Sequence, residues 1–72
     1  MAQVGTGSVA WQAVVAAGMA GAVVAGAQQC IAYWQAQGEA GMVAEAEARL
    51  SRVLAGMASE PDIEGALDWL DA

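Results

Sequence analysis

The side chains that could perform catalysis are confined to the second half of this chain of 72 residues. All eight acidic residues and both arginines lie at or after position 39, and the sequence contains no histidine, the commonest general base. The carboxylates recur at spacings typical of the solvent face of short helices, without a lysine, histidine or tyrosine beside them. We therefore expect a protein that is not an enzyme, with no catalytic residues and no cofactor.

Neither metal binding nor thiol chemistry has a matching pattern. The acids near the C-terminus, Asp62, Glu64, Asp68 and Asp71, could attract a cation, but they lack the glycine and the closing glutamate of a calcium loop. Cys30, the only cysteine, has no histidine or cationic neighbour that would activate its thiol, and it cannot form an internal disulfide. We expect no metal site, and a small buried side chain at Cys30.

A formal net charge of −6 limits the partners of the chain. The phosphate groups of nucleic acids and anionic lipids are bound by clustered lysine and arginine side chains, and only Arg49 and Arg52 are present. We expect no direct contact with nucleic acid. Because a short chain rich in alanine and glycine buries little apolar area by itself, we expect it to pack against other protein subunits, as a homo- or hetero-oligomer.

The first half of the chain is uncharged up to residue 38 and predicts a long apolar helix. Residues 1–8 predict a flexible lead-in, and Ser8 or Thr6 could cap a helix over residues 9–37. Within that helix, residues 9–27 contain one polar side chain, Gln12, over about the length that crosses the hydrocarbon of a bilayer. No basic segment precedes this stretch, as one would in a signal peptide.

Aromatic residues mark both ends of this segment. Trp11 lies near its beginning and Tyr33 with Trp34 near its end, so the two tryptophans would be about 34 Å apart on a straight helix. This spacing approximates that of the aromatic belts at the two faces of a bilayer, and it predicts three membrane-interface anchors. The valines of the segment supply only about −2 kcal/mol of insertion free energy. Burial of the helix inside a protein assembly is therefore the alternative to burial in lipid.

Gly18, Ala22 and Gly26 recur at every fourth position and would form one stripe of small side chains on this helix. Such a stripe allows close helix packing, as in pairs of membrane helices. A segment so rich in alanine contains stripes of this kind by chance. The pattern thus indicates either a close helix contact or a helix of small volume.

An amphipathic helix is predicted after a kink over residues 38–41, which two glycines border. The helix covers residues 42–58, and its apolar residues step by three and four in a heptad seam that would pack on a helix of this chain or of a partner. The seam consists of Val43, Ala46, Leu50, Val53 and Met57. On the polar face, Glu45 and Arg49 are one turn apart and predict an ion pair.

The acidic C-terminal segment, residues 59–72, predicts a short helix. Ser59 and Asp62 match a capping box, and Pro61 is tolerated in a first helical turn. So short a helix is not stable in isolation, so its apolar side chains must dock on this chain or in a groove of a partner. These tail-docking residues are Ile63, Leu67, Trp69 and Leu70.

The order of these segments resembles the N-terminal region of small internal virion or ejection-type structural proteins of tailed bacteriophages. Over about residues 15–53, an apolar helix (AAGMAGAVVAGA) runs into a Gln/Tyr stretch (AYWQAQGEAG) and then into an Ala/Glu/Arg helix (AEAEARLSRV). Proteins of that kind are packaged in the particle and enter the host envelope during genome delivery. The resemblance therefore implies a virion component with membrane contact.

We expect an all-α fold with a long apolar helix, a kink, an amphipathic helix and a short capped C-terminal helix. It would act as a non-catalytic structural protein by helix packing, in contact with a lipid bilayer, and would be located in a membrane or a virion. Two alternatives stay open: a single-span accessory subunit of a bacterial membrane complex, and a helical filament or coat subunit. If the chain spans a membrane, Arg49 and Arg52 place the C-terminus on the cytoplasmic side.

Overall fold

Four helices make up the part of the chain that the computed structural model describes, residues 8–71. They are α1 (Val9–Ala16), α2 (Ala20–Gln37), α3 (Ala40–Leu54) and α4 (Glu60–Asp71). No strand occurs within these residues, and the predicted all-α fold is confirmed. Apart from Ser8, the predicted flexible lead-in over residues 1–8 lies outside the described residues.

Residues 9–37 do not form the continuous helix that the sequence predicted, because the helix ends after α1 and a second helix, α2, follows. α1 ends in a Schellman motif, in which the N–H of Gly18 donates to the carbonyl of Val15 and the N–H of Met19 donates to that of Val14, both at 3.0 Å. Gly18 has a φ of +75°, the left-handed conformation that this motif requires and that glycine adopts without steric cost. The direction of the chain then turns by 114° between α1 and α2.

This turn bears on the predicted membrane segment. Within residues 8–71, no single helix is both long and apolar enough to cross a bilayer. α1 and α2 together meet the length and composition of a span, but only as a bent pair. The straight-helix spacing between Trp11 and Trp34 does not apply, because the two residues lie on helices of different direction.

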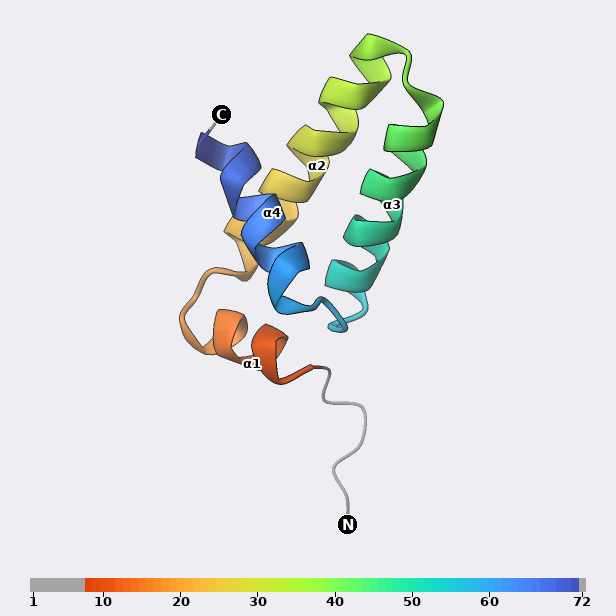
Figure 1. Cartoon of the computed structure of the whole chain (residues 1–72). Coiled ribbons are helices and arrows are strands. Elements are labelled where there is room, and N and C mark those ends of the chain that lie inside the picture. Colours follow the sequence, from red (N-terminus) through yellow and green to blue (C-terminus); the bar gives the residue numbers. More distant parts are fainter. Residues whose placement is uncertain (1–7, 72) are drawn as a thin grey trace.

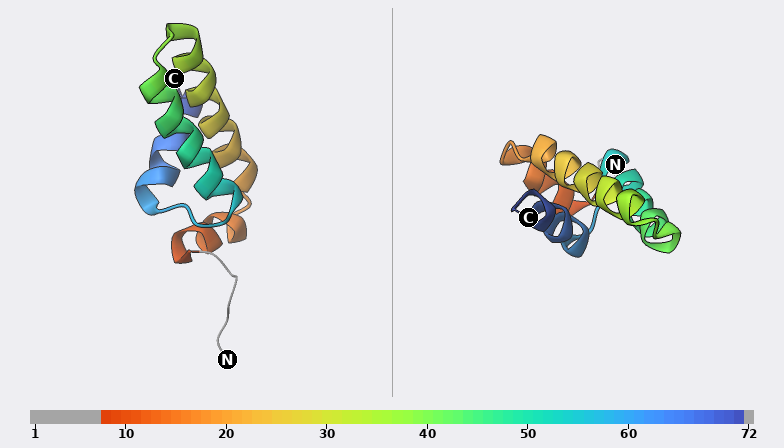
Figure 2. Two further views of the ribbon diagram at one scale, coloured as in Figure 1. Left: turned by 90° about the vertical axis from the view of Figure 1, so that its right-hand side faces the viewer. Right: turned by 90° about the horizontal axis from the view of Figure 1, so that it is seen from above.

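α2 and α3 form an antiparallel hairpin, and α4 lies along α2 (Figure 1). The predicted kink at residues 38–41 is a full reversal of the chain, with Gly38 in the left-handed conformation at the end of α2. α3 ends earlier than predicted, at Leu54, because the chain turns at Gly56. α1 crosses the lower end of the other three helices (Figure 2).

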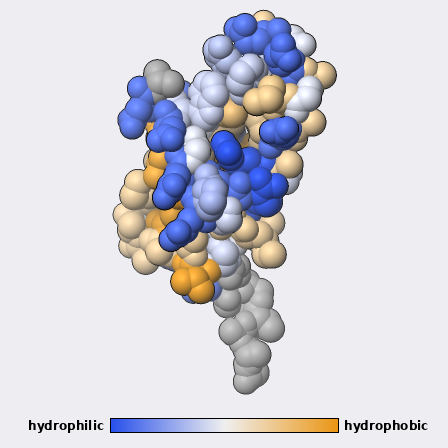
Figure 3. Space-filling view, viewed as in Figure 1, coloured by the Kyte–Doolittle hydropathy of each residue, from blue (hydrophilic) through white to orange (hydrophobic). Residues whose placement is uncertain are grey.

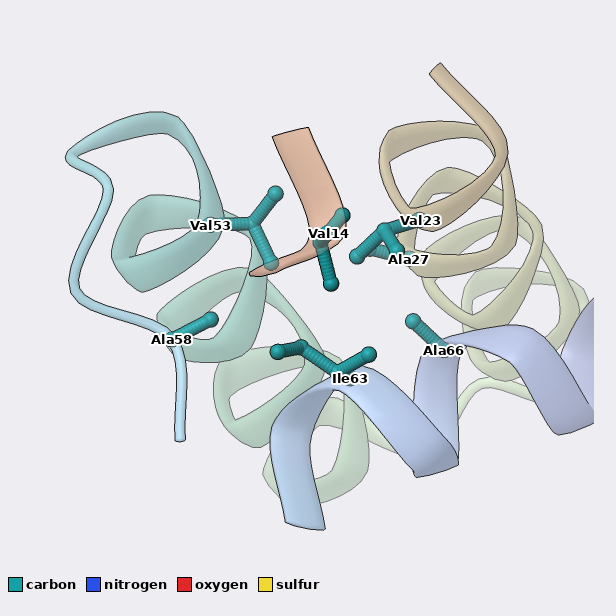
Figure 4. Packing of buried hydrophobic residues seen from close by; sticks show 7 residues of the cluster. All are labelled: Val14, Val23, Ala27, Val53, Ala58, Ile63 and Ala66. Atoms are coloured by element: carbon teal, nitrogen blue, oxygen red, sulfur yellow. The ribbon is translucent and has the colours of Figure 1, made fainter. Parts of the chain in front are cut away.

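The core lies where the four helices meet. Its buried side chains point toward one another from all four helices and the α3–α4 loop (Figure 4): Val14, Val23, Ala27, Val53, Ala58, Ile63 and Ala66. Trp11, Leu50 and Leu67 pack against this cluster from its edges. Because no buried member is larger than isoleucine, the helices have to approach one another closely to exclude water.

The predicted heptad seam of α3 faces inward over most of its length. Ala46 and Val53 are buried, and Val43 and Leu50 are half-buried. Met57 lies beyond the end of α3 and is 62% exposed. The seam therefore packs on helices of its own chain, which was one of the two partners that the sequence left open.

Gly26 is the member of the predicted small-residue stripe that makes a close helix contact. Gly18 lies in the turn after α1, and Ala22 is half-buried in α2. A Cβ atom at Gly26 would overlap the carbonyl oxygen of Ala66, so the backbones of α2 and α4 touch there. Only glycine fits this position without moving α4.

Gly26→Ala is expected to destabilise the protein by about 2 kcal/mol, since the new methyl group must push the α4 backbone away. The matched control is Gly21→Ala in the same helix, where a Cβ meets open space and should stabilise by up to about 1 kcal/mol. Denaturant unfolding followed by circular dichroism measures both changes. Effects of the same sign and size in the two variants would contradict the close crossing.

Candidate functional site

Three aromatic side chains of α2 and α4 pack together beyond the core. The ring centroid of Tyr33 is 4.9 Å from that of Trp34, edge to face, and 5.1 Å from that of Trp69. The rings of Trp34 and Trp69 are 6.4 Å apart, also in an edge arrangement. Tyr33 and Trp34, two of the predicted interface anchors, thus pack against Trp69, a predicted tail-docking residue. The third anchor, Trp11, packs against the core from α1.

α4 docks on α2 of its own chain, rather than projecting toward solvent. Ile63 is buried, Leu67 packs against the core, and Leu70 is half-buried. Farther along the helix, Trp69 reaches Tyr33 in α2. The tail is therefore part of the fold within the described residues.

Asp62, in the first turn of α4, is a buried charged side chain with 6% exposure. Its Oδ2 accepts a hydrogen bond from Nε of Arg52 at 2.7 Å, and its Oδ1 accepts one from Nη2 at 2.8 Å. A bidentate pair of this kind is the strongest arrangement of an arginine and a carboxylate. It joins the start of α4 to the last turn of α3.

Asp62 also completes the predicted capping box, which is confirmed. The N–H of Ser59 donates to Oδ2 of Asp62 at 3.1 Å, and the N–H of Asp62 donates to Oγ of Ser59 at 3.3 Å. The hydrogen bonds from Arg52 and Ser59 hold the pKa of Asp62 well below its ordinary value, against the opposing effect of burial. In return, the hydrogen bond to Asp62 raises the pKa of Arg52.

Arg49 has no comparable partner. Its Nε is 3.7 Å from Oδ1 of Asp62, is shielded from water and makes no hydrogen bond. The guanidinium group lies against Gly65 of α4, where a Cβ would meet it at 2.7 Å. Within the described residues, the predicted ion pair with Glu45 does not form, because Arg49 turns toward α4. Two arginines therefore share one carboxylate.

A cleft of about 230 Å³ opens beside Arg49, between α2, α3 and α4. Its walls are Cys30 and Trp34 of α2, Met42, Glu45, Ala46 and Arg49 of α3, and Trp69 of α4. Cys30 is a free, buried cysteine, as predicted. The cleft thus combines a cation and a carboxylate with aromatic and aliphatic walls. No three His, Cys, Asp or Glu side chains of residues 8–71 gather closely enough to hold a metal ion.

Large apolar side chains are exposed at the end of the molecule opposite the α2–α3 turn. Val9 is 83% exposed, and Leu54, at the end of α3, is 68% exposed. Val15, Met19 and Met57 are also exposed. Figure 3 shows hydrophilic side chains over α4 and α3 on the visible face, and apolar ones at the lower end around α1.

Ser8 fastens α1 to the loop that follows α3. Its N–H donates to the carbonyl of Gly56 at 2.8 Å, and its hydroxyl donates to the carbonyl of Ala58 at 2.7 Å. The same Oγ accepts from the N–H of Trp11 at 3.0 Å, so Ser8, one of the two predicted cap residues, is the helix cap. These bonds hold the start of α1 against the loop that contains the exposed Met57.

Sequence reasoning missed the pair between Arg52 and Asp62, although it used each residue for another purpose. The two are ten positions apart across a loop, and no helical period joins them. Asp62 itself could have indicated the pair. It is a capping residue on the apolar face of α4, so docking of that face buries its charge. A nearby arginine then becomes the expected partner.

Comparisons with known proteins add nothing to this geometry. No family model, no curated protein and no solved structure matches the chain. Its function has to be inferred from the arrangement of its own side chains.

Asp62→Asn should lower stability by about 1–2 kcal/mol at neutral pH, because Arg52, itself half-exposed, loses a charged acceptor. The pKa of Asp62 is lowered in the folded state. The contribution of the pair is therefore fully present above the ordinary aspartate pKa of about 4, and it is lost as the pH falls below that value. Thermal unfolding between about pH 7 and pH 2 should show this acid loss in the native chain and a smaller one in the variant.

Asp68→Asn is the matched control, since Asp68 is an exposed acid on the same helix. It should leave both the stability at neutral pH and the acid loss almost unchanged. An Asp62→Asn chain that loses as much stability in acid as the native chain would contradict the role of the pair.

Proposed function

We propose that this protein is a non-catalytic structural protein whose copies assemble through the end of the molecule built by α1 and the loop after α3. The observation that carries the proposal is the exposure of several large apolar side chains there, on the uncharged helix α1, in the turn after it and at the end of α3. Apolar groups gathered at one place on a surface are typical of sites that bind protein or membrane. This α1 end consists of Val9, Val15, Met19, Leu54 and Met57.

The outer face of α1 is suited to a close helix contact. Trp11 and Val14 turn toward the core, which leaves the small side chains of Ala13 and Ala16 exposed together with Val9 and Val15. The distance between packed helices is set by the side chains at the contact, so small side chains allow a second helix to approach closely. A second copy of α1 meets this requirement.

The charge distribution favours contact between copies at this end. α1 has no charged side chain, so its own residues bring no negative charge into a contact between two copies. Glu60 and Glu64 of α4 line a shallow depression together with Ala10 and Ala13 of α1. Their repulsion across the interface should weaken when salt screens it.

Sedimentation equilibrium of the native chain should show reversible self-association that becomes stronger as salt is raised from about 0.05 to 0.5 M. Leu54→Glu and Met57→Glu should each raise the dissociation constant about tenfold or more by placing a charge in the contact. Both residues are mostly exposed, so the free energy of unfolding should change by only about 0.5 kcal/mol.

Ala36→Glu is the matched control, since Ala36 is exposed near the α2–α3 turn at the far end and the added charge is the same. It should leave the association as it is in the native chain. A native chain that stays monomeric at all concentrations and salt levels would overturn the proposal, as would equal effects of the three variants.

Contact of α1 and α2 with lipid is the second candidate. It is supported by the length and composition of the bent pair. Its cost is that Val23, Gly26 and Ala27 are buried against other helices and would have to leave the core. A filament or coat subunit would use the assembly mode, a single-span accessory subunit would use the lipid mode, and a virion component that enters the host envelope would use both.

Flotation with phosphatidylcholine vesicles separates the two candidates. We expect the native chain to stay in the dense fraction, apart from the floating vesicles, because apolar side chains of α2 are already packed in the core. Flotation that survives alkaline carbonate extraction would favour the lipid candidate. In that case Gly26→Ala, which weakens the contact with α4, should float more readily than Gly21→Ala.

A further inference from the structure

We propose that the cleft beside Arg49 binds a small monocarboxylate with a flat apolar body. The carboxylate would pair with the guanidinium group of Arg49, and the apolar body would lie among Trp34, Trp69 and Met42. This site lies between α2, α3 and α4 and does not involve the exposed side chains of the α1 end.

Arg49 is a cation whose Nε makes no hydrogen bond. Both oxygens of Asp62 already accept hydrogen bonds from Arg52, and Oδ2 also accepts from the N–H of Ser59. Arg49 lies 3.7 Å from that carboxylate and makes no hydrogen bond to it. A planar guanidinium group matches a carboxylate in a bidentate manner, so a carboxylate in the cleft would give the guanidinium group of Arg49, which lines it, a hydrogen-bonded partner.

The walls of the cleft define the rest of the ligand. Trp34 and Trp69 approach it from different helices, with ring centroids 6.4 Å apart, and Met42 and Cys30 add polarizable apolar surface. The volume of about 230 Å³ is below the range of roughly 300–1,000 Å³ that is usual for sites of drug-sized ligands. A one- or two-ring compound therefore suits the cleft better than a nucleotide or a peptide.

Glu45 limits the charge of the ligand. It lines the same cleft and has an exposed carboxylate that forms no ion pair with Arg49 in the described part of the chain. A second negative charge on a ligand would lie near Glu45 and be repelled. The cleft should therefore discriminate against dicarboxylates as well as against uncharged analogues.

Titration of the 15N-labelled protein with 2-naphthoate tests the proposal by NMR. The indole N–H signals of Trp34 and Trp69 should shift and saturate, while that of Trp11, in α1, should stay in place and serve as an internal control. Uncharged 2-naphthamide and a naphthalene dicarboxylate should each bind about tenfold or more weakly than 2-naphthoate. No shift at the two cleft tryptophans up to about 10 mM, or equal binding of the amide, would overturn the proposal.

Two variants locate the recognition. Arg49→Gln should weaken 2-naphthoate binding about tenfold, with the Trp11 signal unchanged as evidence that the fold persists. Glu45→Gln should leave 2-naphthoate binding intact or slightly tighter and should improve binding of the dicarboxylate. Native-like binding by Arg49→Gln, or no gain for the dicarboxylate with Glu45→Gln, would contradict the assigned roles. Neither result depends on self-association through the α1 end.

Discussion

The backbone contact between Gly26 in α2 and Ala66 in α4 is the constraint on which the rest of the structure depends. Because Gly26 has no Cβ at this contact, the two helices approach closely enough for valine, alanine and one isoleucine to fill the core. The close approach of α2 and α4 also brings Trp69 into contact with Tyr33 and Trp34, farther along the two helices. A chain with few large apolar side chains thus compensates for their absence by bringing its backbones together.

The bidentate pair between Asp62 and Arg52 fixes the position of α4 along its neighbouring helices, which close packing alone does not fix. Small, smooth helix faces can slide along one another, whereas two hydrogen bonds at 2.7 and 2.8 Å fix the start of α4 against the end of α3. Because Arg52 is half-exposed, the pair contributes position more than stability. Both oxygens of Asp62 are engaged by this pair, and Nε of Arg49, beside the cleft, makes no hydrogen bond.

Features that depend on residues within four positions of one another could be predicted from the sequence. The cap at Ser8, the capping box at Ser59 and the inward seam of α3 are of this kind. Gly18 could not be assigned, since a glycine in an apolar run suits a packing stripe and a helix end equally well. The choice between a packing stripe and a helix end depends on how α2 folds back over α1. The cleft needs three helices in place, and local reasoning assigned Arg49 to Glu45 instead.

Residues 9–27 are suited to burial in a bilayer and to burial in a protein core for the same reason, because they carry no charge. The turn of 114° after α1 decides how that property is used, because it places the inner faces of α1 and α2 on the same cluster of valines and alanines. Within the described residues, the outer face of α1 and a few neighbouring apolar side chains are left exposed, and they are the surface of the proposed assembly. So small a surface gives weak association between two molecules, since specific interfaces usually bury much more area. It becomes effective when many copies are held together, which is the situation of a structural protein in an assembly.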